Sequence, residues 1–350
     1  GENTRLPLAA VKQNVAFEAA LVLLLEKLTN LTNMLQGQAE RAEGLENCWQ
    51  RATELLKKIE QWYKQTETDK FVRWIEVYSH ALQLNATPLS IAEIFNKQLK
   101  ASPRAWIFTS ATLMVNGGFD HFQRRMGLED AETLGLDSPF NYPEQAMLCV
   151  PRYLPEPNSY AMRETLLETA KRLIKASRGR CFLLFTSHAM LREIAQKLED
   201  EVDNPLLVQG TTTKQALLDA YLADEKAVLM GTGAFWEGVD VRGNDLVCVM
   251  IDKLPFASPD DPLLQARMED VKKRGANPFG VIQIPQAVIT LKQGAGRLIR
   301  DPSDKGVLVI CDNRLVTKPY AKTFVGSLPD MKRTRSLDEV EKFLAGIDEA

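Results

Sequence analysis

The chain has 350 residues, of which 45% are hydrophobic and 25% are charged, and its formal net charge is −3. This balance is typical of folded globular proteins, argues against wholesale disorder, and leaves room for two compact domains. The overall charge does not mark a nucleic-acid binder, but it does not exclude one either, because binding grooves are local features.

The first part of the chain is predicted to be helical. Leucines recur at intervals of three and four residues from Leu21 to Leu35, and a second apolar series runs from Leu45 to Tyr63. Gly37 lies between the two series, where a turn fits. Two amphipathic helices packed as an antiparallel hairpin explain this pattern. A coiled-coil dimer is the alternative, but each series is short for one.

Beyond residue 70 the pattern changes to strands. Phe71–Leu84 and Ala105–Thr109 are predicted strands, and Ser102-Pro103 ends the helix between them, because a residue before proline disfavours helical backbone. Further strands are expected at Cys181–Phe185, Leu206–Gln209, Ala227–Gly231, Leu246–Ile251 and Gly306–Cys311, and helices at Ala189–Leu198, Lys214–Ala223 and Ala287–Leu291.

Strands that alternate with helices indicate right-handed crossovers and a mainly parallel sheet. The strands are apolar at nearly every position, as expected when helices cover both faces. The predicted fold class is therefore α/β, a parallel sheet covered by helices on both faces and preceded by an N-terminal α-helical hairpin. Ligands of such sheets gather at the carboxyl ends of the strands.

The sequence Q-G-A-G-R-L-I-R gives the strongest functional signal. If it is helical, Gln293, Arg297 and Arg300 lie at spacings of four and three residues and share one face. Two guanidiniums and an amide suit phosphate oxygens and resemble the equipment of an arginine finger. Gly294 and Gly296 lower helix propensity, which indicates a close approach there. A surface helix with salt-bridged arginines is the alternative.

The sequence G-T-G-A-F-W-E-G-V-D follows a predicted strand and begins at Gly231. Glycines allow the backbone to approach a ligand, and backbone N–H groups together with Thr232 can hold a phosphate. Glu237, Gly238 and Asp240 complete the candidate site, with Asp240 facing either the arginine segment or a nucleotide ribose. A tight connection with incidental acids is the alternative.

Two weaker signals also lie at strand ends. Ser110 and Thr112 in T-S-A-T-L suit coupling through switchable hydrogen bonds, and Thr186 and Ser187 in F-T-S-H are placed to contact a backbone phosphate. Helix N-caps explain either pair equally well.

The order of S-A-T, F-T-S, G-T-G-x-x-W-E-G-x-D and Q-x-x-G-R-x-x-R along the chain resembles motifs III, IV, V and VI of superfamily 2 helicases. The wording of G-A-F-W-E-G-V-D and Q-G-A-G-R-L-I-R, with Leu254-Pro255-Phe256, resembles the DinG branch of the XPD-like helicases, and within it the YoaA-type bacterial proteins. The resemblance covers about residues 75–325. Residues 1–75 match only in being helical, where the family inserts its arch domain.

The resemblance implies a RecA-like second motor domain that clamps ATP and Mg²⁺ against a first domain. Arg297 and Arg300 would reach the γ-phosphate with Gln293 beside them. Glu237, Gly238, Asp240, Ser110 and Thr112 would couple ATP to DNA, and Thr186, Ser187 and Thr232 would touch the DNA strand. The implied domains are an arch-like region (1–75), a remnant of the first motor domain ending in motif III (76–115), and the second RecA-like domain with a C-terminal tail (116–350).

The resemblance also implies an ATP-dependent DNA helicase of 5′-to-3′ polarity that acts on single-stranded or forked DNA in repair or replication. Its parent protein would carry a 4Fe–4S cluster. This chain lacks G-x-x-x-x-G-K-[ST] and a D-E-A-H box after a strand. We therefore expect the C-terminal half of such a helicase, inactive by itself.

The main alternative is a non-catalytic docking module. Arg333 and Thr334 lie in a basic C-terminal stretch, and YoaA-type proteins are expected to bind the χ subunit of DNA polymerase III. A translocating remodeller with the same motifs is a second alternative.

The five cysteines form no C-x-x-C pair, so we expect neither disulfides nor a metal site. Without a signal-peptide pattern or a long apolar run, a cytoplasmic bacterial protein that does not enter the membrane is expected.

Overall fold

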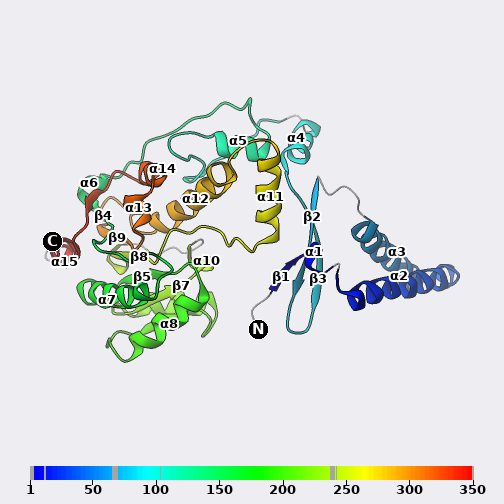
Figure 1. Cartoon of the computed structure of the whole chain (residues 1–350), viewed down its shortest axis with the longest axis horizontal. Coiled ribbons are helices and arrows are strands. Elements are labelled where there is room, and N and C mark those ends of the chain that lie inside the picture. The colour runs from blue at the N-terminus through cyan, green and yellow to red at the C-terminus, as the bar shows by residue number, and fades with distance from the viewer. Residues whose placement is uncertain are drawn as a thin grey trace. The chain divides into compact units, whose positions relative to one another are not determined.

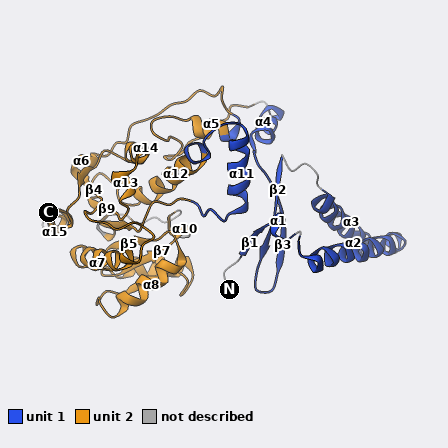
Figure 2. Ribbon diagram, in the orientation of Figure 1, with its two compact units in different colours: residues 1–103, 125–127, 257–281 blue, residues 104–124, 128–256, 282–350 orange. Residues whose placement is uncertain are grey.

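The computed structural model describes residues 4–11, 13–64, 70–102, 104–236, 241 and 243–348. The chain divides into two compact units (Figure 2). Unit 1 comprises residues 1–103, 125–127 and 257–281, and unit 2 comprises residues 104–124, 128–256 and 282–350. Each unit is thus assembled from segments that are distant along the chain.

The predicted helical hairpin is confirmed in unit 1. Helices α2 (Val15–Gln36) and α3 (Glu43–Lys64) pack side by side (Figure 1) and are joined through a short 3-10 helix, Ala39–Arg41. The side chain of Asn14 caps α2 by accepting hydrogen bonds from the backbone N–H groups of the first turn, at 3.1 and 3.2 Å.

Unit 1 also contains an antiparallel sheet in the order β1-β2-β3, with β1 at Thr4–Pro7, β2 at Phe71–Val77 and β3 at Leu82–Pro88. The predicted strand Phe71–Leu84 is therefore wrong as one strand, because residues 78–81 turn the chain back into a hairpin. The Trp62 indole N–H donates to the Asn85 carbonyl at 2.8 Å and ties α3 to this sheet.

The remaining helices that belong wholly to unit 1 are α1 (Leu8–Val11), α4 (Ala92–Ala101) and α11 (Pro262–Lys273). Helix α4 ends just before Ser102, which has extended backbone, as the Ser102-Pro103 pair predicts. Helix α11 packs against β2.

Unit 2 is built on a parallel sheet, which has seven strands within the described residues, in the order β10-β4-β9-β8-β5-β7-β6. Its strands are β4 (Ala146–Cys149), β5 (Cys181–Leu184), β6 (Leu206–Val208), β7 (Val228–Gly231), β8 (Cys248–Ile251), β9 (Gly306–Ile310) and β10 (Lys332–Thr334). The predicted α/β, RecA-like class is confirmed.

Helices cover both faces of this sheet. In one layer, α7 (Tyr160–Ser177) contacts both α8 (His188–Glu199) and α15 (Leu337–Asp348). In another, α12 (Ile284–Ala295) contacts both α10 (Gly233–Trp236) and α14 (Ala321–Ser327). The remaining helical segments are α5 (Asp120–Met126), α6 (Tyr142–Gln145), α9 (Lys214–Ala223), α13 (Arg314–Thr317), the 3-10 turn Gly243–Asp245 and the π-helical turn Phe279–Gln283.

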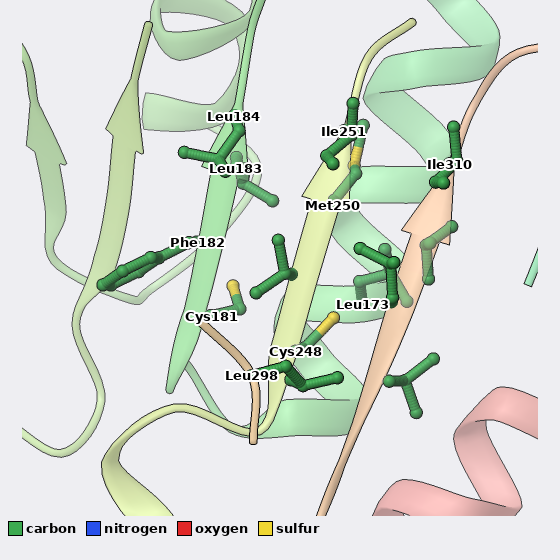
Figure 3. Packing of buried hydrophobic residues seen from close by; sticks show 14 of the residues in the cluster. Leu173, Cys181, Phe182, Leu183, Leu184, Cys248, Met250, Ile251, Leu298 and Ile310 are labelled. Carbon is green, nitrogen blue, oxygen red and sulfur yellow. The ribbon is translucent and has the colours of Figure 1, made fainter. Parts of the chain in front are cut away.

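The core of unit 2 lies between the sheet and these helices. The inner strands β5, β8 and β9 are buried at every position, which explains why their sequences are apolar throughout instead of alternating. Figure 3 shows side chains of β5 and β8, among them Phe182 and Met250, packed together with Leu173 of α7 and with Leu298.

The predicted strand Ala105–Thr109 is not a strand. Residues 105–110 have no regular secondary structure, and no strand pairs with them in the part of the chain that the structure describes. An extended segment becomes a strand only when a neighbour supplies hydrogen-bonding partners. Trp106 and Ile107 are instead exposed, at 46% and 84%.

Candidate functional site

Polar residues of unit 2 gather where the parallel strands end. Thr186 and Ser187 follow β5, Thr232 follows β7, Asp252 follows β8 and Asp312 follows β9. Because parallel strands end at the same edge, these residues share the edge at which such sheets bind ligands. Three of the predicted residues, Thr186, Ser187 and Thr232, are therefore brought to one side of the domain.

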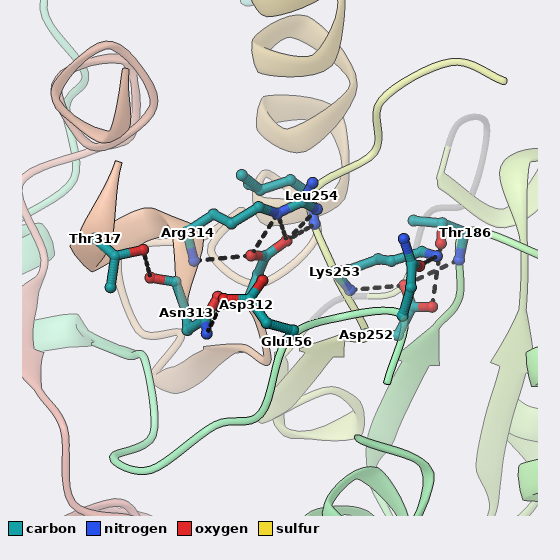
Figure 4. Close-up of polar contacts among 10 residues, drawn as sticks. Glu156, Thr186, Asp252, Lys253, Leu254, Asp312, Asn313, Arg314 and Thr317 are labelled. Atoms are coloured by element: carbon teal, nitrogen blue, oxygen red, sulfur yellow. Dashed lines mark hydrogen bonds and ion pairs between the residues drawn. The ribbon is translucent and has the colours of Figure 1, made fainter. Parts of the chain in front are cut away.

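Asp252 is the buried carboxylate of this edge. Its oxygens accept hydrogen bonds from the Thr186 backbone N–H at 3.0 Å and from the Thr186 hydroxyl at 3.1 Å (Figure 4). The Lys253 backbone N–H donates a third bond at 2.8 Å. Burial nevertheless raises the pKa of Asp252 from 3.8 to about 7, since desolvation penalises the charged form.

The sequence prediction missed Asp252, although its position was informative. An acid directly after an apolar strand, with Lys253 and Leu254 behind it, lies at the ligand-binding edge of a parallel sheet. What the sequence could not show is its partner, because Thr186 lies 66 positions earlier along the chain.

Ser187 has a different environment from its neighbour Thr186. It is the N-cap of α8, and its hydroxyl oxygen accepts from the Met190 backbone N–H at 3.3 Å. The N-cap alternative is thus correct for Ser187, and it is compatible with a ligand contact, because a hydroxyl that accepts a cap bond still has its hydrogen to donate.

Thr232 is buried and satisfied within the protein. Its backbone N–H and its hydroxyl both lie within hydrogen-bond distance of the Gln209 side-chain oxygen, at 2.6 and 3.1 Å. The hydroxyl also lies 3.2 Å from Nε2 of His188. Gln209 and His188 were not predicted as site residues, and this contact is what identifies them.

The arginine segment does not form one helical face as expected. Helix α12 ends at Ala295 and Gly296 is its C-cap, so Arg297 and Arg300 lie beyond the helix that carries Gln293. The physical reason is the low helix propensity of Gly294 and Gly296, which ends the helix before Arg297.

The expected close approach in this segment is confirmed at Gly294. A Cβ placed on Gly294 would lie 2.9 Å from Cε3 of Trp236, so the indole packs directly on the backbone of α12. The Arg297 guanidinium donates to the Trp236 carbonyl at 2.7 and 3.2 Å. The structure therefore brings the Q-G-A-G-R-L-I-R and G-T-G-A-F-W segments into contact.

The backbone of Arg300 is fixed by a hydrogen bond to Asp304. Its N–H donates to the buried Asp304 carboxylate at 2.7 Å, and burial lowers the pKa of its guanidinium. Gln293 lies half-buried in the last turn of α12. Desolvated guanidiniums interact strongly with an anion, because no water competes with them.

Ser110 and Thr112 lie in the first segment of unit 2, before the first strand of its sheet. Their side-chain oxygens are 3.1 Å apart, and Ser110 Oγ also accepts the Thr112 backbone N–H at 3.2 Å. Glu237, Gly238 and Asp240 lie outside the described residues, so their predicted roles stay predictions.

Asp312 forms a second buried carboxylate site that the sequence prediction missed (Figure 4). It accepts from the Leu254 backbone N–H at 2.8 Å and from the Arg314 guanidinium at 2.6 to 3.1 Å. Arg314 in turn lies over the Phe256 ring, 5.3 Å from its centroid. This network fixes the L-P-F segment to the end of β9.

Arg333 and Thr334 lie in the edge strand β10 and so are part of the folded sheet. The Thr334 carbonyl accepts the Val150 N–H at 3.2 Å, and its hydroxyl accepts the Ser336 N–H at 3.1 Å. Arg333 is exposed and lies 3.8 Å from Asp330. Of the pair, Arg333 is therefore the side chain that a partner could meet.

Within the described residues, no group of three or more histidine, cysteine, aspartate or glutamate side chains is arranged to hold a metal ion. No helix among these residues is long and apolar enough to cross a membrane.

Comparison with known proteins gives consistent matches. Residues 170–331 match a helicase C-terminal domain family. The chain is 45% identical over 344 residues to the ATP-dependent DNA helicase YoaA of Haemophilus influenzae, covering 98% of this chain and 54% of that protein. It is 37% identical over 266 residues to the ATP-dependent helicase DinG of Mycobacterium tuberculosis, covering 75% of this chain and 40% of that protein.

The chain thus spans about half the length of the YoaA relative. Among solved structures it resembles one titled XPD_Helicase with a TM-score of 0.56 at 17% identity, covering 95% of this chain and 65% of that one. At this identity the likeness concerns the fold.

Proposed function

Because this chain belongs with the YoaA-type, DinG/XPD-like helicases, we propose that it supplies the second motor domain of an ATP-dependent DNA helicase. The contact between Arg297 and the Trp236 carbonyl carries this proposal. This contact joins the two segments that would face the nucleotide and the DNA. If the arginines only formed salt bridges on a surface helix, a contact between Arg297 and this carbonyl would not be expected.

In this proposal Arg297 and Arg300 stabilise the negative charge that develops on the γ-phosphate of ATP during hydrolysis, with Gln293 beside them. Mg²⁺ would neutralise the phosphates from the side of a first motor domain. Burial of Arg300 supports the assignment, because a partly desolvated guanidinium interacts strongly with a phosphate.

The proposed domain boundaries are 1–75 for the arch-like region, 76–115 for the end of a first motor domain and 116–350 for the second. The exposed side chains of Trp106, Ile107 and Phe108 support the middle assignment. A contiguous apolar segment seldom stays in water. We place this segment in the sheet of a first motor domain, where Ser110 and Thr112 would end a strand at the ATP site.

The proposed substrate is single-stranded or forked DNA, unwound from 5′ to 3′ during repair or replication in the bacterial cytoplasm. The hydroxyl of Ser187 would meet a backbone phosphate at the carboxyl edge of the sheet. Thr186 and Thr232 would shape that edge, because their hydroxyls are engaged inside the protein.

The four buried cysteines do not fit a 4Fe–4S cluster, and Cys48, which is exposed, cannot hold one alone. Cys149, Cys181, Cys248 and Cys311 are buried in or beside separate strands, and burial raises the pKa of the Cys181 thiol to about 12. Cluster ligands are thiolates. We therefore place any cluster of the whole protein outside this chain.

The exposure of Arg333 favours a second candidate function, docking of a replication partner such as the χ subunit of DNA polymerase III. An acidic partner surface would suit the basic edge strand β10. The buried side chains of Val340 and Leu344 are unavailable to such a partner, because they pack in the core of unit 2.

The decisive experiment uses the full-length protein. Arg300→Ala should lower ATP turnover stimulated by single-stranded DNA about a hundredfold or more, with ATP and DNA binding retained. This chain alone should show no turnover in a preparation free of contaminating ATPase. Unchanged turnover in the variant would return Arg300 to a structural role and favour the docking function.

A further inference from the structure

A tight turn, residues 115–118, lies two residues beyond the S-A-T segment. Val115 and Gly118 exchange two backbone hydrogen bonds, of 2.9 and 3.1 Å. Between them Asn116 and Gly117 both have positive φ angles, of 50° and 80°. These are the properties of a two-residue type I′ turn. Thr112 lies three residues before Val115, so a short length of chain joins the S-A-T segment to the turn.

The turn is anchored to two helices of unit 2. The Lys292 ammonium, in the last turn of α12, donates to the Met114 carbonyl at 3.0 Å. The Asn116 backbone N–H donates to Ser327 Oγ, at the end of α14, at 2.8 Å. A Cβ on Gly326 would lie 2.9 Å from the Asn116 side-chain oxygen, so that glycine makes room for the turn.

Stability does not explain the choice of lysine at position 292. Its ammonium is half-buried, burial lowers its pKa, and the acceptor is a neutral carbonyl without a carboxylate. Burying a charge against a neutral partner costs free energy that an apolar side chain of similar length would not. Lys292 also directly precedes Gln293 and lies on the helix that leads to Arg297.

We propose that Lys292 is a positioning residue that couples the S-A-T segment to the arginine segment. It holds residues 114–118 against α12, so that a displacement of Thr112 moves the helix end from which Arg297 extends. The proposal rests on the helicase function proposed above. It assigns Lys292 no contact with ATP or DNA.

The test compares Lys292→Met with Lys292→Arg in the full-length protein. Lys292→Met keeps the length but removes the donor, and Lys292→Arg keeps a charged donor. We expect Lys292→Met to match or exceed the wild type in thermal stability. The number of base pairs that this variant unwinds per ATP hydrolysed should fall about tenfold. Coupling free energies between two sites typically correspond to an effect of this size. Lys292→Arg should recover most of this loss.

Two further variants sharpen the result. Ser327→Ala loosens the second anchor and should lower the same ratio, and the double variant Lys292→Met with Ser327→Ala should lose less than the sum of both. Lys197→Met, at an exposed lysine of α8 paired with Glu193, should leave the ratio unchanged.

The outcomes separate the two proposals. If the wild type hydrolyses ATP with DNA stimulation and Lys292→Met keeps its unwinding per ATP, the coupling role is wrong and the helicase function stands. The coupling role is equally wrong if Lys292→Met loses stability and activity together, because that identifies a packing residue. If the wild type neither hydrolyses ATP nor unwinds DNA, the helicase function itself fails.

Discussion

Thr186 donates both its backbone N–H and its hydroxyl to the carboxylate of Asp252, at 3.0 and 3.1 Å. When Asp252 is ionised its carboxylate only accepts, so the single hydrogen of the Thr186 hydroxyl is then used inside the protein. Ser187, one residue later, accepts the cap bond of α8 and keeps its own hydrogen. The Thr186 hydroxyl therefore bonds within the protein, whereas the Ser187 hydroxyl can still donate to a ligand.

This difference predicts how variants bind single-stranded DNA. Ser187→Gly removes the hydroxyl without adding a charge, at a residue type that N-caps tolerate. It should weaken binding roughly tenfold or more, the loss of one hydrogen bond to a charged group. Ser187→Thr keeps the hydroxyl and should bind like the wild type, as should Thr186→Val. Fluorescence anisotropy with a labelled oligonucleotide measures each affinity. Weak binding by Thr186→Val in a stably folded protein would show that Thr186 is the phosphate contact.

The raised pKa of Asp252 makes stability depend on pH. In the folded chain it is about 7 against an ordinary 3.8, so the folded state binds a proton more tightly than the unfolded state. Protonated Asp252 therefore contributes to the free energy of unfolding. This contribution is complete below pH 4 and is lost as the pH rises through 7.

Between pH 5 and pH 8 this loss amounts to roughly 3 kcal/mol. Asp252→Asn cannot titrate, so its unfolding free energy should fall less over this interval than that of the wild type, as measured by urea unfolding at both pH values. Parallel curves for the two proteins would mean that Asp252 has an ordinary pKa.

Gly294 should not tolerate a side chain. Alanine at this position would place Cβ 2.9 Å from Cε3 of Trp236, and such overpacking costs about 1–3 kcal/mol. Gly346→Ala is the matched control, because Gly346 lies within α15 with no atom within 4 Å of its added Cβ, and this change should stabilise by about 0.5–1 kcal/mol. Thermal unfolding of both variants should shift in opposite directions.

Asp312 should contribute strongly to stability. Asp312→Ala leaves the Arg314 guanidinium partly buried without its carboxylate and the Leu254 N–H without its acceptor, at a cost of about 3–5 kcal/mol. Asp338→Ala removes an exposed partner of Arg172 and should cost at most about 1 kcal/mol. Equal urea midpoints for the two variants would contradict the assignment of Asp312 as a buried anchor.

The amino-acid sequence by itself determined the fold class, and it predicted which segments form the site. Predicted strands such as Leu246–Ile251 are apolar at every position and alternate with amphipathic helices. This pattern is typical of a parallel sheet with helices on both faces. The arginine and glycine motifs are local in sequence, so their spacing alone was enough to predict them as candidate sites.

Only the tertiary structure decided which hydroxyl is engaged, where the arginine helix ends, and what Lys292 binds. Asp252 and Thr186 are 66 positions apart, and Lys292 and Met114 are 178 apart, so no local pattern joins them. Ala105–Thr109 was predicted as a strand from composition, but a strand requires a neighbour, which the segment's own sequence does not contain. Hydrogen-bond partners across a fold are set by packing, and packing depends on the whole chain.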